Sequence, residues 1–491
     1  MRSGSVDEIN LYSPYIRSLI RRKTVASLTT ILSSHLNNLQ YEDLPPESVE
    51  KAKDLLLDYL GYTIYGSDEN PARILRKTFT DLGGPKESIV LGHNLRLPSV
   101  NAAFLNGSAG HMAELDDSHR GTQSHVGDSV LAAALAIAEK QSSDGKELLT
   151  AITCGYEMAI RVGLAGMPSH YTKGWHPSGS INTFGAAMAA GKLLNHTDEQ
   201  ATQTVAIAGG QVAGNFAHLG ERAMMKDFNP GRAASNGVLA ALLGKNNFTG
   251  GTNAIENPKG FLALYSDTHN IEELTTDLNG PRKILEVAHK PFPGCRHLHS
   301  SRDALIDILK SEIGKSNLTL DDVEQVTARI YEIGADYVDD PEPWAKGKGI
   351  YGPSFSAQFN LALVLQEGEK GLWELFNPEY SLEKVNESKL QEMMGKINIV
   401  HDQELMKDFP DKIGAEVTLT TNEGSFKRRV DLPKGEPENP ITKDELHGKF
   451  TVLTTARGFS NKQSAEVIQA ITNLDTLENT NDLTNMLIPE H

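Results

Sequence analysis

GSINTFGAAMAAGKLL (residues 179–194) and GRAASNGVLAALLG (residues 231–244) are the two stretches that decide how this chain folds. Both have apolar residues at helical spacing, but most of these residues are Ala or Gly rather than large side chains. Helices with little side-chain bulk can pack close to their neighbours. We therefore predict that the two segments are central helices of one large bundle.

Further helical segments surround this pair. A run behind Pro45-Pro46 places apolar residues at helical spacing from Val49 to Ile64. After KGEPENP (434–440), Thr442 and Glu445 match a capping box, which predicts that the chain is helical again towards Met486. Similar spacing recurs in 101–112, 129–140, 146–163 and 198–212. The chain is therefore predicted to be mainly α-helical.

The pattern changes near residue 280, where several prolines interrupt the helical spacing. A short helix is expected over 300–309. VEQVTARIYEIG (323–334) alternates between apolar and polar residues and predicts a strand, with Val326, Ala328 and Ile330 on one face. AEVTLTT (415–421), a turn ending in Gly424, and the SFKRRVDL that follows predict a hairpin.

The 491 residues are too many for one compact core. We predict a large helical domain made of residues 1–279 and 434–491. A smaller α+β domain, residues 280–433, interrupts it and is expected to act as a lid.

The composition of the chain excludes several classes of binding partner. The chain has 47 basic and 64 acidic residues, a net charge of −17, so nucleic acid and anionic membranes are not expected partners. No uninterrupted apolar run approaches about 18 residues, so no membrane span is expected. An acidic protein that binds an acidic substrate must gather positive charge locally. The search for a site is therefore a search for clustered His, Lys and Arg.

The cysteines and the N-terminus bear on location. Cys154 and Cys295 are too few for a disulfide framework or a conventional iron–sulfur cluster, and they fit a reducing compartment. The first 23 residues lack the apolar core of a secretory signal, and Asp7 and Glu8 weaken an organelle presequence. We expect a cytoplasmic protein.

The densest polar segment is HMAELDDSHRGTQSHVGD (111–128). It is compatible with an active-site loop, with a metal site, or with an ordinary polar loop between helices. A metal site is disfavoured because no HExxH or HxxEH pattern is present. The segment contains His111, His119, His125, Glu114, Asp116 and Asp117.

Two further segments place cationic or aromatic residues before small-residue helices. In KGWHPSG (173–179), Trp175 and His176 precede a helix start, which suits a carboxylate ligand; otherwise Trp175 simply anchors the turn. In AMMKDFNPGRAASNG (223–237), Lys226 and Arg232 lie at an expected helix start. Basic residues there oppose the helix dipole unless an anion is bound, although a surface lysine is the plain alternative.

A fourth segment, HKPFPGCRHLHSSRDA (289–304), falls where the domain character changes, and such junctions favour ligand sites. It contains His289, Lys290, Arg296, His297 and His299. A metal site built on Cys295 and the histidines lacks a second thiol pair and is disfavoured.

In this order, and together with FTGGTNAIENPKGF (248–261) and YGPSFSAQFN (351–360), these segments resemble the MmgE/PrpD family from about residue 30 to 480. That family contains 2-methylcitrate dehydratase and cis-aconitate decarboxylase. The resemblance implies a large helical domain interrupted by an α+β lid, a homodimer, and catalysis without a metal or organic cofactor.

The resemblance also implies site residues. Those expected to be catalytic are His125, His176, Lys226, His299 and, in ADYVDDPEP (335–343), Tyr337; those expected to bind substrate are Glu114, Asp116, Asp117, Arg296 and Arg232. The chain departs from the family pattern in two places. Glu114 stands where many members have Asp, and the loop from Asp117 to His125 is about one residue longer than in the decarboxylases.

These residues suit chemistry through an α-carbanion. Cationic donors stabilise the charge that builds up beside a carboxylate, and a histidine with a pKa near about 6.5 exchanges protons at neutral pH. We therefore expect a lyase acting on a small di- or tricarboxylate, by dehydration or decarboxylation, with epimerisation as an alternative. The competing classes are a metallohydrolase built on 111–125 and 295–299, and a non-catalytic helical scaffold.

Overall fold

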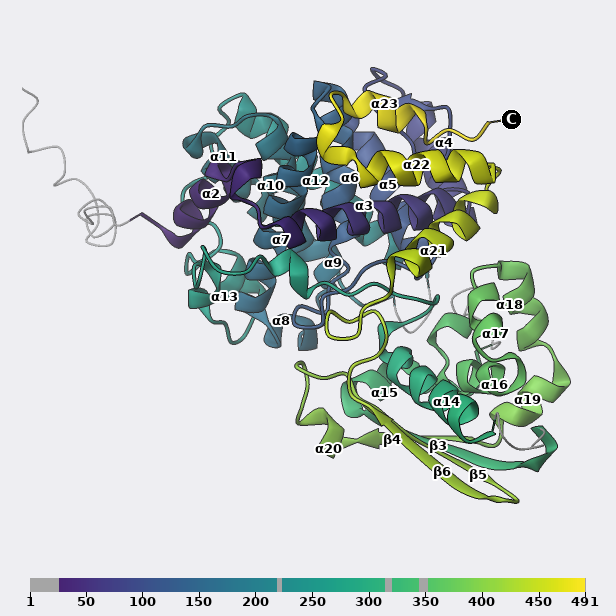
Figure 1. The fold of residues 1–491 in the computed structure, drawn as a ribbon. Coiled ribbons are helices and arrows are strands. Elements are labelled where there is room, and N and C mark those ends of the chain that lie inside the picture. The colour runs from purple at the N-terminus through teal and green to yellow at the C-terminus, as the bar shows by residue number, and fades with distance from the viewer. Residues whose placement is uncertain (1–25, 219–222, 314–319, 344–351, 491) are drawn as a thin grey trace, which may run out of the picture.

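A computed structural model describes residues 26–218, 223–313, 320–343 and 352–490 (Figure 1). The N-terminal 23 residues, with their expected lack of a secretory signal, lie outside the described residues. The first body is helical. Its helices are α2 (Leu28–Asn38), α3 (Pro46–Gly66), α4 (Asn70–Leu82), α5 (Ser99–Met112), α6 (Gly127–Gln141), α7 (Gly145–Gly166), α8 (Ser169–Thr172), α9 (Pro177–Ser180), α10 (Asn182–Leu193), α11 (Asp198–Gly209), α12 (Met225–Lys245) and α13 (Phe261–Tyr265), with a short hairpin of β1 (Ser88–Ile89) and β2 (Arg96–Leu97).

The two small-residue segments form α10 and most of α12, and both lie in the centre of this body. Helix α10 packs against α6, α7, α11 and α12. A Cβ atom added to Gly185 of α10 would lie 2.6 Å from the carbonyl oxygen of Gly155 in α7, and one added to Gly237 of α12 would lie 2.5 Å from the Cβ of Ala186. Larger side chains would push the helices apart, so the predicted central bundle is confirmed.

Helix α12 differs from the prediction at its start. It begins at Met225 rather than near residue 231, and it continues through Pro230 although proline removes one backbone hydrogen bond. Lys226 therefore lies in the first turn. Arg232 follows six residues later, about 240° around the helix, and it is exposed.

Helix α7 is the one helix in the described residues that is long and apolar enough to cross a membrane by length and composition. However, 94% of the relevant window is buried inside the protein. It also carries the ion pair between Glu157 and Arg161, both of which are buried. Helix α7 is therefore a core helix.

The second body contains a four-stranded sheet in the order β4-β3-β5-β6. Helix α14 packs on β5 and β6. The predicted short helix, strand and hairpin are confirmed as α14, β3, β5 and β6, whereas β4, parallel to β3, was not predicted. The elements are α14 (His299–Ser311), β3 (Val323–Tyr331), α15 (Glu332–Val338), α16 (Ala357–Glu367), α17 (Glu369–Glu374), α18 (Pro378–Val385), α19 (Ser388–Met394), β4 (Ile397–Asp402), α20 (Gln403–Met406), β5 (Ala415–Thr421) and β6 (Gly424–Val430).

The chain then returns to the helical body as α21 (Lys443–Thr455), α22 (Asn461–Thr472) and α23 (Thr480–Asn485). The predicted capping box of Thr442 and Glu445 begins α21. Helix α21 packs against α3, and the C-terminal helices lie on the same body as the N-terminal half in Figure 1. Ile284 and Val287 also belong to this core. A separate core begins at Phe292, so the packing changes near residue 290 rather than at 280.

Candidate active site

A pocket lies where the two bodies meet, and both contribute to its lining. Six of the residues expected in the site line it: Glu114, His125, His176, Lys226, Arg296 and Tyr337. The other lining residues are Ser118, His119, Arg120, Gln123, Tyr171, Phe216, Cys295, His297, Phe355 and Ile413. The pocket therefore has cationic and imidazole groups together with an aromatic wall, which is made of Tyr171, Phe216, Tyr337 and Phe355.

Local structure brings these side chains together. His111 lies in the last turn of α5, and the chain then turns sharply at Glu114, whose φ is 53°. Backbone bridges between His119 and Ser124, and between Ser118 and Ala288, hold the following loop. The loop therefore has a fixed shape beside the segment that carries Lys290 and Arg296.

Lys226 is a buried ammonium group at the pocket. Its Nζ lies 2.7 Å from Glu114 Oε1 and donates to His111 Nε2 at 2.6 Å. Burial alone would lower the pKa of Lys226, but Glu114 and Asp116 outweigh burial and raise it. The group therefore stays charged at neutral pH. An ammonium has three protons. Among the described residues Glu114 and His111 accept two of them, and the Phe355 ring centroid lies 5.7 Å from the nitrogen. The third proton has no hydrogen-bond acceptor in the part of the chain that the structure describes.

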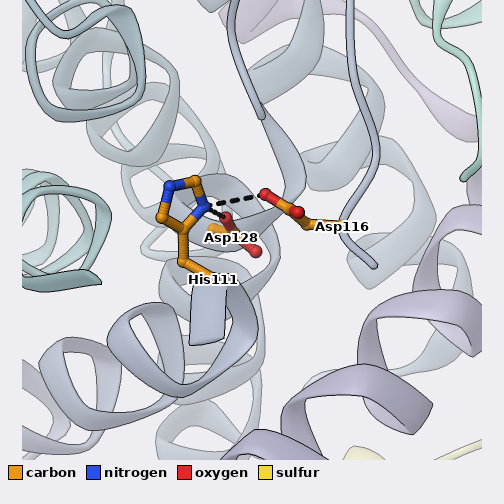
Figure 2. Close-up of side chains that lie close together, drawn as sticks. All are labelled: His111, Asp116 and Asp128. Carbon is orange, nitrogen blue, oxygen red and sulfur yellow. Dashed lines mark hydrogen bonds and ion pairs between the residues drawn. The ribbon is translucent and has the colours of Figure 1, made fainter. Parts of the chain in front are cut away.

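His111 is the link between this lysine and two buried carboxyl groups (Figure 2). Its Nδ1 lies 2.7 Å from Asp116 Oδ2 and 2.8 Å from Asp128 Oδ2. Burial, reinforced by Lys226, lowers the pKa of His111 to about 4, so the ring is neutral. The proton then lies on Nδ1, because Nε2 accepts from Lys226.

The two carboxyl groups titrate in opposite directions. Burial would raise the pKa of Asp116, but His125, Lys290 and His111 hold it well below its usual range. Burial, together with Asp116 and Asp117, raises the pKa of Asp128 well above its usual range. Asp116 is therefore a carboxylate at neutral pH, and Asp128 is the member of the pair that takes up a proton first as the pH falls.

His111, Asp116 and Asp128 also have the donor set of a metal site. However, their donor atoms are already hydrogen-bonded at 2.7 and 2.8 Å. The ammonium of Lys226 contacts His111, and that of Lys290 lies 2.8 Å from Asp116 Oδ1. A divalent cation would be repelled by both ammonium groups. The charges fit proton sharing better than metal binding.

His125 and His176 face the pocket in complementary ways. The Nδ1 of His125 lies 2.7 Å from the Asp117 carbonyl oxygen and 2.9 Å from Asp116 Oδ2, so Nε2 is the nitrogen available to a ligand. The Asn229 amide donates to Nδ1 of His176 at 3.0 Å, so the proton of His176 lies on Nε2. Burial, together with the charge of Lys226, holds the pKa of His176 well below 6.5. His176 is therefore a neutral hydrogen-bond donor.

Asp116 and Asp117 support the pocket from behind and do not line it. Both are buried. Asp117 accepts from the Tyr156 hydroxyl at 2.7 Å and from the Gly127 N–H at 2.9 Å, and burial raises its pKa to about 6. The two aspartates hold the loop and His125 from behind the pocket lining, and the expected contact with substrate stays a prediction.

Two more predicted residues lie away from the pocket lining. Arg232 is exposed, because it lies about 240° around α12 from Lys226, which lines the pocket. His299 is buried, and its Nδ1 lies 3.1 Å from Arg296 Nη1. His297 lines the pocket instead; its Nδ1 contacts the Tyr331 hydroxyl, and burial lowers its pKa to about 3. It stacks on Tyr337 with ring centroids 5.4 Å apart.

Glu436, on the linker back to the helical body, joins both sides of the pocket. Its Oε1 accepts from Arg296 at 2.7 Å and its Oε2 accepts from Arg120 at 2.9 Å. Glu436 is 1% exposed. The two arginines are therefore held at the pocket by one buried carboxylate.

A second buried lysine supports the same loops. Lys449 of α21 lies 2.7 Å from Asp58 Oδ1 and donates to the carbonyl oxygens of Leu115 at 2.8 Å and Lys290 at 2.9 Å. Leu115 lies between Glu114 and Asp116, and Lys290 contacts Asp116. The C-terminal segment thereby fixes the backbone around the pocket.

The fold and the pocket define a helical protein with an inserted α+β body and a pocket lined by four histidines and Lys226. The MmgE/PrpD N-terminal domain model matches residues 30–274, and the MmgE/PrpD C-terminal domain model matches residues 292–476. The chain belongs to the MmgE/PrpD family, so the predicted resemblance is confirmed.

Several relatives match nearly the whole chain. Human cis-aconitate decarboxylase is 24% identical over 471 residues, 94% of each chain. The cis-aconitate decarboxylase-like protein oryM of Aspergillus oryzae is 27% identical over 483 residues, 94% of this chain and 96% of that protein. Cis-aconitate decarboxylase of Aspergillus terreus is 24% identical over 449 residues, 87% and 89% of the two chains.

Proposed function

We propose that this protein is a lyase that decarboxylates a small polycarboxylate of the cis-aconitate type, without a metal or organic cofactor. The observation that carries the proposal is Lys226, a buried ammonium at the pocket for which the described residues supply two hydrogen-bond acceptors, so that a third proton is available to a ligand. Such a group binds a carboxylate and stabilises the charge that develops beside it. The names of the relatives favour decarboxylation over dehydration.

The chemical step needs a stabilised carbanion and a proton donor. The bond between one carboxylate carbon and its neighbour breaks, CO2 leaves, and the electron pair stays on the substrate carbon. The charge spreads towards a remaining carboxylate, where Lys226 and the Nε2–H of His176 donate hydrogen bonds. A protonated His125 gives its proton to carbon, and the Asp116 carboxylate compensates the charge of that imidazolium.

His125 can then recover a proton from solvent, because its side chain is 18% exposed. Arg296 and Arg120 hold further carboxylates near the mouth of the pocket. Dehydration and epimerisation pass through a similar carbanion, so the same residues would serve them.

NMR of purified protein with cis-aconitate, citrate and 2-methylcitrate tests the proposal. We expect cis-aconitate to lose CO2, with one deuterium entering the product in D2O, and EDTA dialysis to leave the rate unchanged. If citrate or 2-methylcitrate loses water and cis-aconitate does not lose CO2, the protein is a dehydratase rather than a decarboxylase. If no acid reacts and none raises the melting temperature, the chain is a non-catalytic scaffold.

A further inference from the structure

A second cavity adjoins the carboxylate pocket. It has a volume of about 150 Å³. None of the described residues that line it is charged, in contrast to the carboxylate pocket. Its lining residues are Gly121, Gln123, Leu164, Met167, Pro168, Tyr171, Thr172, Phe409 and Pro410.

Gln123 and Tyr171 line both cavities, so the two spaces meet at these side chains. The ring of Tyr171 contacts Phe216 and Tyr337, with centroids 5.4 and 5.8 Å away, and both of those residues line the carboxylate pocket. Gln123 is half-buried, and its side-chain amide donates to the Arg120 carbonyl oxygen, so opening the partition at this residue requires this one hydrogen bond to break. The aromatic wall of the first pocket therefore leads to the apolar cavity.

The loop between Asp117 and His125 contributes to the lining of both cavities. Gly121 and Gln123 of this loop line the apolar cavity, and Gln123 has a φ of 50°. The partition between the two cavities is therefore formed in part by this loop.

We propose that the apolar cavity is a subsite for an alkyl substituent on the substrate. The preferred substrates are then polycarboxylates that carry a short alkyl chain, with their carboxylates at Lys226 and the arginines. An apolar cavity of about 150 Å³ holds a benzene-sized hydrocarbon, so the chain has up to about six carbons. The part of this inference that concerns turnover rests on the proposed function, whereas the part that concerns binding does not.

A series of alkyl-substituted cis-aconitates tests the subsite. We expect kcat/KM to rise about fourfold for each methylene buried, up to about six carbons, and then to fall. In parallel, calorimetry with unreactive alkylsuccinates should show Kd falling with the same dependence on chain length. Values of kcat/KM and Kd that are flat, or that worsen from the first carbon, would overturn the subsite.

Two variants locate the effect. Met167→Trp fills the cavity and should reduce the preference for a pentyl-substituted over an unsubstituted acid at least tenfold. Leu164→Phe removes volume more gently and serves if the first variant does not fold. The matched control is Ile74→Trp, at an exposed position of α4, which should keep the preference of the unaltered protein. An unchanged preference in both cavity variants would contradict the proposal.

The two arms separate the two hypotheses. Turnover of cis-aconitate without a dependence on chain length would refute the subsite and leave the proposed reaction intact. Tighter binding of longer alkylsuccinates without turnover of any acid would refute the reaction and support the subsite.

Discussion

Two buried lysines, Lys226 and Lys449, have almost the same surroundings and different consequences. Lys226 contacts Glu114 and His111, and Lys449 contacts Asp58, which in turn lies 3.0 Å from His289 Nδ1. Each cluster therefore joins an ammonium, a carboxylate and an imidazole inside the protein.

The clusters differ in how many ammonium protons the protein itself satisfies. Lys449 has an acceptor for all three: Asp58 and the carbonyls of Leu115 and Lys290. Lys226 has two acceptors within the described residues and lines a pocket. The comparison teaches that residue type and burial do not distinguish the lysine that we propose to be catalytic from a structural one. The number of ammonium protons that the described residues accept does distinguish them.

Lys226→Met should have the largest effect. Without the ammonium the developing carbanion loses its main stabilisation, and we expect kcat/KM to fall at least about 1,000-fold, or about 4 kcal/mol. Steady-state kinetics measure the loss. Circular dichroism should show an unchanged fold, because Glu114, which loses its ammonium partner in this variant, can take up a proton and become neutral. A fall of less than tenfold would remove Lys226 from the mechanism.

Lys449→Met should act on stability instead. Removing one partner of a buried ion pair costs about 3–5 kcal/mol, and urea unfolding should show a loss of about 4 kcal/mol. Lys443→Met is the matched control on the same helix. Lys443 is 52% exposed and pairs with Glu50 and Asp54 of α3, so its loss should cost less than about 1 kcal/mol. Equal losses in the two variants would contradict the structural role of Lys449.

Acid should destabilise both clusters together. Burial lowers the pKa of His111 and of His289 to about 4, so below their unfolded pKa of about 6.5 only the unfolded chain binds these protons. The contribution of these two histidines to the free energy of unfolding is therefore fully present at neutral pH and is lost as the pH falls towards 4. From pH 7.5 to 5.5 each histidine costs about 1.4 kcal/mol, or about 3 kcal/mol together.

Asp117, whose pKa burial raises to about 6, works in the opposite direction and offsets less than about 1 kcal/mol. Burial also raises the pKa of Asp128, which adds to this offset. The variant His289→Gln isolates one histidine: at pH 5.5 it should take up about one proton fewer on unfolding than the unaltered protein. The pH dependence of urea unfolding measures this uptake, and equal uptake in the two proteins would contradict the ionisation state of His289.

The smallest expected effect separates two neighbouring histidines. His297→Gln changes a group that lines the pocket and should lower kcat/KM about tenfold to a hundredfold, or about 1.4–2.7 kcal/mol. His299→Gln should lower it about threefold at most, since that ring contacts Arg296 rather than the pocket. Kinetics of the two variants under one condition decide between them. The reverse order would restore His299 to the site.

Much of the fold was readable from the sequence because local patterns set it. The small residues of α10 and α12, the alternation in β3 and the hairpin of β5 and β6 depend on neighbours along the chain. Strand β4 was missed, since its partner β3 lies far away in sequence and is reached through helices. The start of α12 was misplaced because Pro230 is normally a sign of a helix boundary.

The site was predicted in outline but not in its details. Glu114, His125, His176 and Lys226 line the pocket as expected. Whether His297 or His299 faces the pocket depends on the geometry where α14 begins, and spacing does not reveal it. His111 and Lys290 stood in the segments that were singled out, yet their roles depend on contacts across the molecule. Lys449 gave no local signal at all.

The return of α21 to the helical body also has a consequence for synthesis. The carbonyl oxygens of Leu115 and Lys290 accept hydrogen bonds from Lys449, which the ribosome adds some 160 residues after Lys290. Arg120 and Arg296 likewise pair with Glu436, which is also added late. A nascent chain that stops between residues 413 and 436 contains the described pocket residues but lacks both Glu436 and Lys449. Premature termination late in the message should therefore yield a protein without its activity.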